Sequence, residues 1–150
     1  MPEKRTLERA RRDARQGKSP STQAGEFVRE EMHHIREGKH GAASSKQAIA
    51  IGLSKARRAG VKLPPPRKGT VSEKTRKSAM SAYRKGQRRT KPSARRSQAR
   101  SKALRREGRS AASHRALSRQ ASSAARRRSP AMRSAAARKA ARTRSRQRWR

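Results

Sequence analysis

Residues 44–60, with the sequence SSKQAIAIGLSKARRAG, are the stretch in which local chemistry most clearly predicts structure. Ser44 followed three residues later by Gln47 is the pattern of a capping box, which satisfies backbone amides at the start of a helix. Gly60 is the residue type that most often follows a last helical turn, where the backbone becomes left-handed. Between these ends, an apolar spacing of i, i+4 and i+7 predicts one buried face, formed by Ile49, Leu53 and Ala56.

A second helix is predicted before this one, over residues 26–37. It repeats the i, i+4, i+7 spacing of apolar residues, with Phe27 at the border of that face, and the glycines that follow mark a turn. Two antiparallel helices joined by this turn form a hairpin over residues 24–66. The predicted hairpin core consists of Val28, Met32, Ile35, Ile49 and Leu53.

The composition limits the kind of fold that the whole chain can form. Of its 150 residues, 45 are Lys or Arg and 9 are Asp or Glu, so the formal net charge is +36. Leu, Ile, Val and Phe together make up 12 residues, or 8% of the chain. This is far below the roughly 20% under which a highly charged chain is expected to be disordered. We therefore expect a mainly α-helical protein with extensive disorder, and not an enzyme.

The charge is distributed unevenly along the chain. Residues 1–73 carry 17 basic and 8 acidic residues, whereas residues 74–150 carry 28 basic residues and one acidic residue, Glu107. Such asymmetry indicates a mixed-charge half followed by a basic tail. The predicted segments are a flexible basic arm (1–23), the helical hairpin (24–66) and an Arg-, Ala- and Ser-rich tail (67–150).

Glycine, proline and serine divide the tail into stretches that are able to form helices. Ala is the best helix former and Arg is nearly as good, but like charges four residues apart oppose each helix. We expect the tail to be largely coil when unbound and to gain helix on a polyanion. The stretches run from Ser72 to Lys85, from Ser93 to Glu107, from Ser110 to Arg128, and from Pro130 towards Arg148.

Clusters of arginine indicate the partner of the tail. Arginine stays charged at any cellular pH and binds phosphate through two parallel hydrogen bonds. We therefore expect a nucleoid-associated or histone-like protein that binds nucleic acid through the phosphate backbone with little sequence preference, DNA first and RNA second. The residues predicted to contact phosphate are Arg57, Arg58, Arg88, Arg89, Arg95, Arg96, Arg105, Arg106, Arg126, Arg127, Arg128, Arg142, Arg144, Arg146 and Arg148.

Other functions have weaker support in the sequence. RNA or ribosome association would use the same arginines. The hairpin of residues 24–66 is alternatively a module for self-association or for a protein partner, because Ile51 lies outside its predicted core. Specific base reading by the second helix is disfavoured, since the segment from Gly38 to Ala43 is longer than the usual turn of about 3–4 residues in a helix-turn-helix.

The sequence predicts no cofactor, no metal, no small-molecule substrate and no membrane segment. The absence of cysteine excludes disulfides, a thiol nucleophile and a Cys-based zinc site. His33, His34 and His40 lie near Glu30 and Glu31, but a surface histidine pair at a helix end is the favoured interpretation. No apolar run reaches about 18 residues and the N-terminus has no apolar signal region, so we expect a cytoplasmic protein.

Residues 25–41, GEFVREEMHHIREGKHG, and residues 45–60, SKQAIAIGLSKARRAG, resemble a segment of an uncharacterised family of small basic bacterial proteins. The most specific part is KQAIAIGLS, residues 46–54, within the KQAIAIGLSKARRAG segment of residues 46–60. The resemblance covers residues 24–66 and implies a bacterial cytoplasmic protein, with no established activity or catalytic residues. The tail is similar in composition to bacterial histone H1-like proteins but lacks their regular Lys-Ala-rich repeats.

Overall fold

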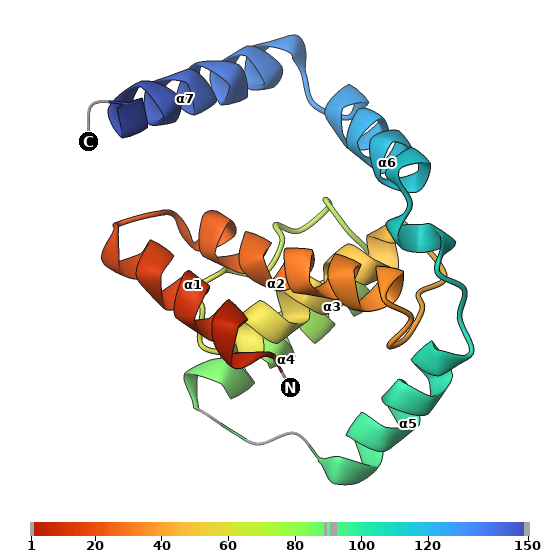
Figure 1. Ribbon diagram of the computed structural model, residues 1–150. Helices are drawn as coiled ribbons and strands as arrows, with labels where there is room; N and C mark the ends of the chain where they lie inside the picture. The colour runs from red at the N-terminus through yellow and green to blue at the C-terminus, as the bar shows by residue number, and fades with distance from the viewer. Residues whose placement is uncertain (1, 89, 91–92, 149–150) are drawn as a thin grey trace. The chain divides into compact units, whose positions relative to one another are not determined.

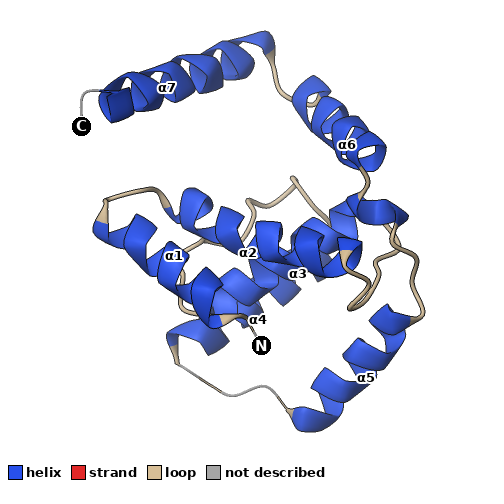
Figure 2. Ribbon diagram, viewed as in Figure 1, coloured by secondary structure: helices blue, strands red, loops and turns tan. Residues whose placement is uncertain are grey.

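The computed structural model describes residues 2–88, 90 and 93–148, with the backbone alone for 146–148, and these residues contain helices and no strand (Figures 1 and 2). The mainly α fold predicted from the sequence is confirmed. None of the described helices is long and apolar enough to cross a membrane.

The chain has two compact units, one up to Ser113 and one from His114 onward. The first unit contains α1 (Lys4–Arg15), α2 (Pro20–Arg36), α3 (Ser45–Arg58), α4 (Glu73–Gln87), α5 (Ala94–Arg105) and the short 3-10 helix η1 (Ser110–Ala112), and the second contains α6 (His114–Arg126) and α7 (Pro130–Arg148).

The ends of α3 lie where the sequence predicts them. Ser44 accepts a hydrogen bond from the backbone N–H of Gln47 at 3.2 Å, and the Gln47 side chain in turn accepts from the N–H just before Ser44. At the other end, Gly60 has a φ of 93°, and Val61 N–H donates to the Ala56 carbonyl at 3.1 Å. These are the bonds of an N-cap and of a Schellman motif, so both predicted ends are confirmed.

The apolar face of α2 forms the centre of the first unit. Phe27 and Ile35 are completely buried and Met32 nearly so, which confirms the predicted inward position of Met32 and Ile35. Val28, also predicted to lie in the core, is half-buried. An apolar cluster around Phe27 joins α1, α2, α3 and the segment after α3. Its buried members are Ala10, Ala24, Phe27, Ala56 and Val61.

The buried face of α3 differs from the predicted one. Ile49 and Leu53 are half-buried, whereas the fully covered positions belong to small residues. Gly52 explains the difference, because a Cβ atom there would lie 2.7 Å from the Cα of Val28. The small face lets the backbones of α2 and α3 approach closely, and this displaces the larger side chains from the centre of the contact. The buried small residues are Ala48, Gly52 and Ala56.

The segment predicted to be a flexible arm contains a packed helix instead. Helix α1 lies against α2 (Figure 1), with Ala10 buried and Leu7 half-buried in the apolar cluster. Arg9 of α1 forms an ion pair with Glu26 of α2. Helix α1 packs on α2 because a narrow face of small and apolar residues runs along it, although its average composition is strongly polar.

Helix α4 packs against α3, although its residues lie in the predicted tail. Ala79, Ala82 and Gly86 are its buried residues. A Cβ atom at Gly86 would overlap the carbonyl oxygen of Arg57, so this glycine permits the contact between the two helices. The outer side of α4 is left exposed and carries the basic residues Lys74, Lys77 and Arg84.

The segment that ends with η1 folds back on the loop between α2 and α3. Gly41 N–H donates to the Leu104 carbonyl at 2.9 Å, and the Ser45 hydroxyl donates to the Ala111 carbonyl at 2.7 Å. A Cβ atom at Gly41 would overlap the backbone of Glu107. These contacts make α5 and η1 part of the first unit.

The disorder predicted for the tail is not supported. The described residues after 72 form four α-helices, α4 to α7, close to the four stretches predicted to be able to form helices. Ser72 accepts from the N–H of Thr75 at 3.2 Å, and Ser129 accepts from the N–H of Met132 at 3.3 Å. Serine caps and the high helix propensity of Ala and Arg outweigh the repulsion between like charges that motivated the prediction.

Candidate nucleic-acid interface

Acidic side chains neutralise basic ones in only one part of the described structure. Every ion pair among the described residues lies between residues 3 and 76. Asp13 with Lys18, at 2.7 Å, is an example. The only acidic residue after position 73 is Glu107, and it takes part in none of these pairs. The described basic side chains of α5, α6 and α7 therefore have no acidic partner.

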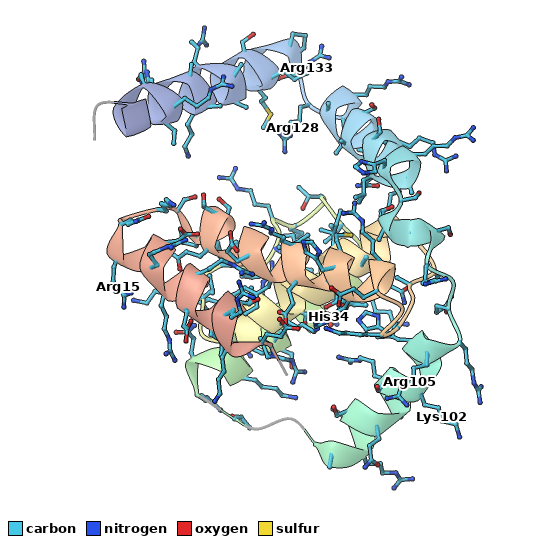
Figure 3. The ribbon with its side chains drawn as sticks, viewed as in Figure 1. Arg15, His34, Lys102, Arg105, Arg128 and Arg133 are labelled. Atoms are coloured by element: carbon cyan, nitrogen blue, oxygen red, sulfur yellow. The ribbon has the colours of Figure 1, made fainter. Side chains whose placement is uncertain are left out.

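Most of the arginines predicted to contact phosphate have exposed side chains. Figure 3 shows Arg105 on α5, with Arg128 and Arg133 on either side of the start of α7. Arg89 lies outside the described residues, as do the side chains of Arg146 and Arg148. The exposed predicted residues are Arg88, Arg95, Arg96, Arg105, Arg106, Arg126, Arg127, Arg128, Arg142 and Arg144.

Arg57 has a structural role and is not available to a phosphate group. The residue is 6% exposed, and its guanidinium donates to the carbonyls of Leu63 at 3.2 Å and Pro64 at 3.3 Å. Burial also lowers the pKa of Arg57. The side chain holds the proline-rich segment against α3, so its assignment to the interface is corrected.

Arg58 lies near two arginines of α5. Burial lowers the pKa of Arg58, and the charges of Arg100 and Arg96 lower it further. Its Nε atom is buried without a hydrogen-bond partner. Because an anion would relieve the repulsion between these charges, the three arginines form a candidate phosphate contact. Arg100 is not among the residues predicted from the sequence.

A basic hollow of about 630 Å³ lies along the outer side of α4. Of its basic residues, only Arg88 is predicted from the sequence. Adjacent arginines on a helix point in different directions, whereas residues three or four apart share a face, so the spacing of single basic residues could have identified the others. The hollow is lined by Arg76, Lys77, Met80, Ser81, Arg84, Lys85, Arg88 and Thr90.

A second basic hollow, of about 440 Å³, lies on α6 in the other compact unit. Its lining combines guanidinium groups with serine hydroxyls and contains no acidic residue. Arg126 and Arg127 are predicted from the sequence, whereas Arg119 is not. The hollow is lined by Ser118, Arg119, Ser122, Ser123, Arg126 and Arg127.

The three histidines near the end of α2 do not behave as one surface group. His33 is exposed, whereas His34 and His40 are half-buried, with their ring centroids 6.1 Å apart (His34 is labelled in Figure 3). A hydrogen bond between His34 and the Glu3 carboxylate, and to a smaller extent one from Lys39, lowers the pKa of Glu3. Of the predicted surface pair of histidines, only His33 is exposed, whereas His34 is half-buried.

Comparison with known proteins identifies one similarity. A family of unknown function (DUF6496) matches residues 15–68, a little over a third of the chain, which includes α2 and α3. No curated protein and no solved structure matches the chain. The helices at the centre of the first unit are thus similar to an uncharacterised family, and the match brings no activity with it.

Proposed function

We propose that this protein binds nucleic acid through the phosphate backbone, without catalysis and with little preference for sequence. It acts as a nucleoid-associated or histone-like protein in a bacterial cytoplasm, with duplex DNA as the first partner and RNA as the second. The outer side of α4, the basic residues of α5 and the helices of the second unit make the contacts. Helices α1 to α3 form the support on which α4 and α5 are held.

The observation that carries the proposal is the positive charge that remains unpaired beyond residue 76. No acidic residue occurs in residues 108–150, and the described arginines there are exposed. Counterions are condensed on nucleic acid and are released when cationic side chains neutralise phosphates, so binding gains entropy with every contact. Charge of this density is the physical property on which such binding depends.

The two hollows have the chemistry that phosphate requires. Arginine offers paired donors that match two phosphate oxygens, and serine hydroxyls such as those of Ser118 and Ser122 add single donors. Neither hollow is lined by an acidic residue that would repel the ligand. The hollow on α4 and the hollow on α6 each suit one stretch of sugar–phosphate backbone.

The side chains of the described residues give little support for sequence-specific recognition of bases. Phe27 is completely buried and Tyr83 is half-buried, so neither forms a platform on which bases stack. The exposed side chains of the hollows are of the types that position a protein on the backbone. We therefore expect similar affinities for unrelated sequences.

Fluorescence anisotropy with the full chain tests the proposal near physiological ionic strength. The probes are two duplex DNAs of unrelated sequence and one RNA hairpin of matched length. We expect both duplexes to bind with affinities that agree within a few fold. Tighter binding to the RNA hairpin would favour the RNA alternative, and an absence of binding to all three probes would overturn the proposal.

Association through residues 24–66 is the second candidate function. It has less support, because the exposed large apolar residues in the described part of the chain, Val71 and Met132, lie outside that segment. Sedimentation of the full chain, freed of nucleic acid, distinguishes the two. A monomer is the expected result, and a stable dimer would favour association.

A further inference from the structure

A group of acidic and histidine side chains gathers where α2 meets the loop that follows it. Glu31 and His34 are three residues apart on α2 and therefore share a face, and His40 comes from the loop. One donor atom from each of the three lies within 4.8 Å of the other two. The group is separate from the basic hollows, so a ligand bound to it would not depend on nucleic-acid binding.

The carboxylate of Glu31 is completely buried, yet it accepts no well-aligned hydrogen bond. Lys55 Nζ lies 2.6 Å from Oε2, and His40 Nε2 lies 2.9 Å from Oε1. These are close contacts between charged or polar atoms, but neither has the geometry of a hydrogen bond. A buried carboxylate is costly unless its oxygens are directed at a cation, and Lys55 lies against Oε2 only.

The Nε2 atom is the ring nitrogen of His40 that lies close to this carboxylate. The other ring nitrogen, Nδ1, lies 3.0 Å from the carbonyl oxygen of Gly41. Since a carbonyl only accepts, Nδ1 carries the hydrogen of the neutral ring, and Nε2 is the nitrogen that remains to bind a metal ion. An unprotonated nitrogen 2.9 Å from a carboxylate oxygen is repelled by it, and a proton or a metal ion shared by the two atoms would relieve this repulsion.

His34 is held in place by a carboxylate of its own. Its Nε2 atom lies 2.8 Å from Glu3 Oε1 and 3.8 Å from Glu30 Oε1. Glu30 is 3% exposed, and its Oε2 atom has no hydrogen-bond partner. Carboxylates that contact an imidazole in this way commonly fix the rings of metal-binding histidines.

We propose that Glu31, His34 and His40 bind a divalent transition-metal ion, and that zinc is the ion this donor set fits best. Two imidazoles and one carboxylate are an established ligand set for zinc, with bonds of about 2.0–2.2 Å. At tetrahedral angles such bonds place donor atoms roughly 3.4 Å apart, so the 2.9 Å between Glu31 Oε1 and His40 Nε2 needs only a small adjustment. Lys55 stays in contact with Oε2 of Glu31, so this carboxylate binds the metal ion through Oε1 alone.

The ion would fix the loop after α2 to that helix. The residue next to His40 is Gly41, whose N–H donates to the Leu104 carbonyl at 2.9 Å. A metal on His40 therefore also stabilises the attachment of the end of α5. Three protein ligands leave the fourth tetrahedral position to water, and loss of the ion would weaken the first unit.

Cobalt titration of the full chain, without an affinity tag and freed of nucleic acid, tests the site directly. Co²⁺ bound at a tetrahedral nitrogen and oxygen site absorbs visible light, and added Zn²⁺ should displace it and abolish the absorption. We also expect Zn²⁺, but not Mg²⁺, to raise the midpoint of thermal unfolding. Absence of the cobalt spectrum together with an unchanged midpoint in Zn²⁺ would overturn the proposal.

Four variants locate the ion. His40→Ala and Glu31→Gln should weaken Co²⁺ binding by more than about tenfold, since each removes a ligand. His33→Ala and His114→Ala change exposed histidines and should leave both the spectrum and the affinity unchanged. Circular dichroism identifies any variant that has lost its helices, and His40 lies in a loop, so its loss should spare them. A spectrum that survives His40→Ala, or one that His33→Ala abolishes, would contradict the assignment.

Discussion

Helices α1 to α3 and helices α6 and α7 are built from similar residues that serve opposite purposes. In the first group, alanines such as Ala10 and Ala24 are buried, and Arg9 and Lys55 contact acidic side chains of α2. In α7, the described alanines are exposed, and no acidic residue is present to pair with the arginines. Alanine thus fills a core in one region, and in the other it contributes only helix propensity.

The difference shows how a chain with few large apolar residues forms both a packed region and an exposed cationic region. Where acidic residues neutralise the charge, small side chains let helices approach closely and a core forms around Phe27. Where no acidic residues occur, helices form locally and leave their charge open to solvent. Isolated helices of this kind are marginal in water, so a polyanion is the natural source of further stabilisation for α7.

Removal of the large side chain at the centre of the first unit should have the largest effect. Phe27→Ala leaves a cavity where α1, α2 and α3 meet, and we expect it to cost about 3–5 kcal/mol of unfolding free energy. Denaturant unfolding followed by circular dichroism measures the loss. Met132→Ala in α7 is the control, because Met132 is 61% exposed. A similar loss in both variants would contradict the division into a packed and an open region.

Two glycine substitutions separate close helix packing from helix propensity. Gly86→Ala places a Cβ atom against the carbonyl of Arg57 and should destabilise the first unit by about 1–3 kcal/mol. Gly25→Ala, in α2, has no atom near the added Cβ and should stabilise the protein by about 0.5–1 kcal/mol. Thermal unfolding of both variants shows whether each substitution raises or lowers the stability of the protein. An increase in stability with Gly86→Ala would show that α4 does not pack on α3.

Removal of charge from α6 should weaken binding to duplex DNA without unfolding the first unit. Replacement of Arg119, Arg126 and Arg127 by Gln should reduce the slope of log K against log salt by about 2–3 if each contacts a phosphate. Anisotropy titrations at several salt concentrations measure the slope.

The matched control removes the same charge from α1, where Arg5, Arg11 and Arg12 are exposed. Their replacement by Gln should change the slope by less, because acidic residues offset part of the positive charge in the region of α1. Equal changes in the two triple variants would mean that net charge, and not the surface on α6, determines affinity.

Loss of a helix cap should have the smallest effect. Ser44→Ala removes the side chain that accepts from Gln47 N–H at 3.2 Å and should cost about 1 kcal/mol. Ser93 also precedes a helix but its side chain makes no capping bond, so Ser93→Ala is a control that should change stability very little. Thermal unfolding distinguishes the two, and equal losses would remove the assigned role of Ser44.

Helix ends were predictable from the sequence because each depends on a few neighbouring residues. Ser44, Gly60 and Pro130 act through local backbone geometry, and the structure places helix ends beside all three. The buried face of α3 was not predictable in this way. A ranking by hydrophobicity selects Ile49 over Gly52, whereas the close approach of two backbones depends on which side chain is absent.

The candidate interface was predictable in kind but not in position. Net charge and arginine clusters indicate a phosphate-binding surface, but burial of Arg57 depends on the distant fold of the proline-rich segment. The role of Arg76 and Arg84 in the hollow on α4 follows from helical spacing, which adjacent clusters do not reveal. The Glu31 and His40 contact joins a helix to a loop, so no local pattern predicts its geometry.

The salt dependence of duplex DNA binding by the full chain is the decisive test of the proposed phosphate contacts. We predict that log K falls linearly with log salt between about 50 and 200 mM, with a slope of about −5 or steeper, as expected when six or more phosphates are neutralised. The slope should be the same for duplexes of unrelated sequence. A slope near zero, or no measurable binding at the lowest salt concentration, would contradict the claim that unpaired arginines hold the phosphate backbone.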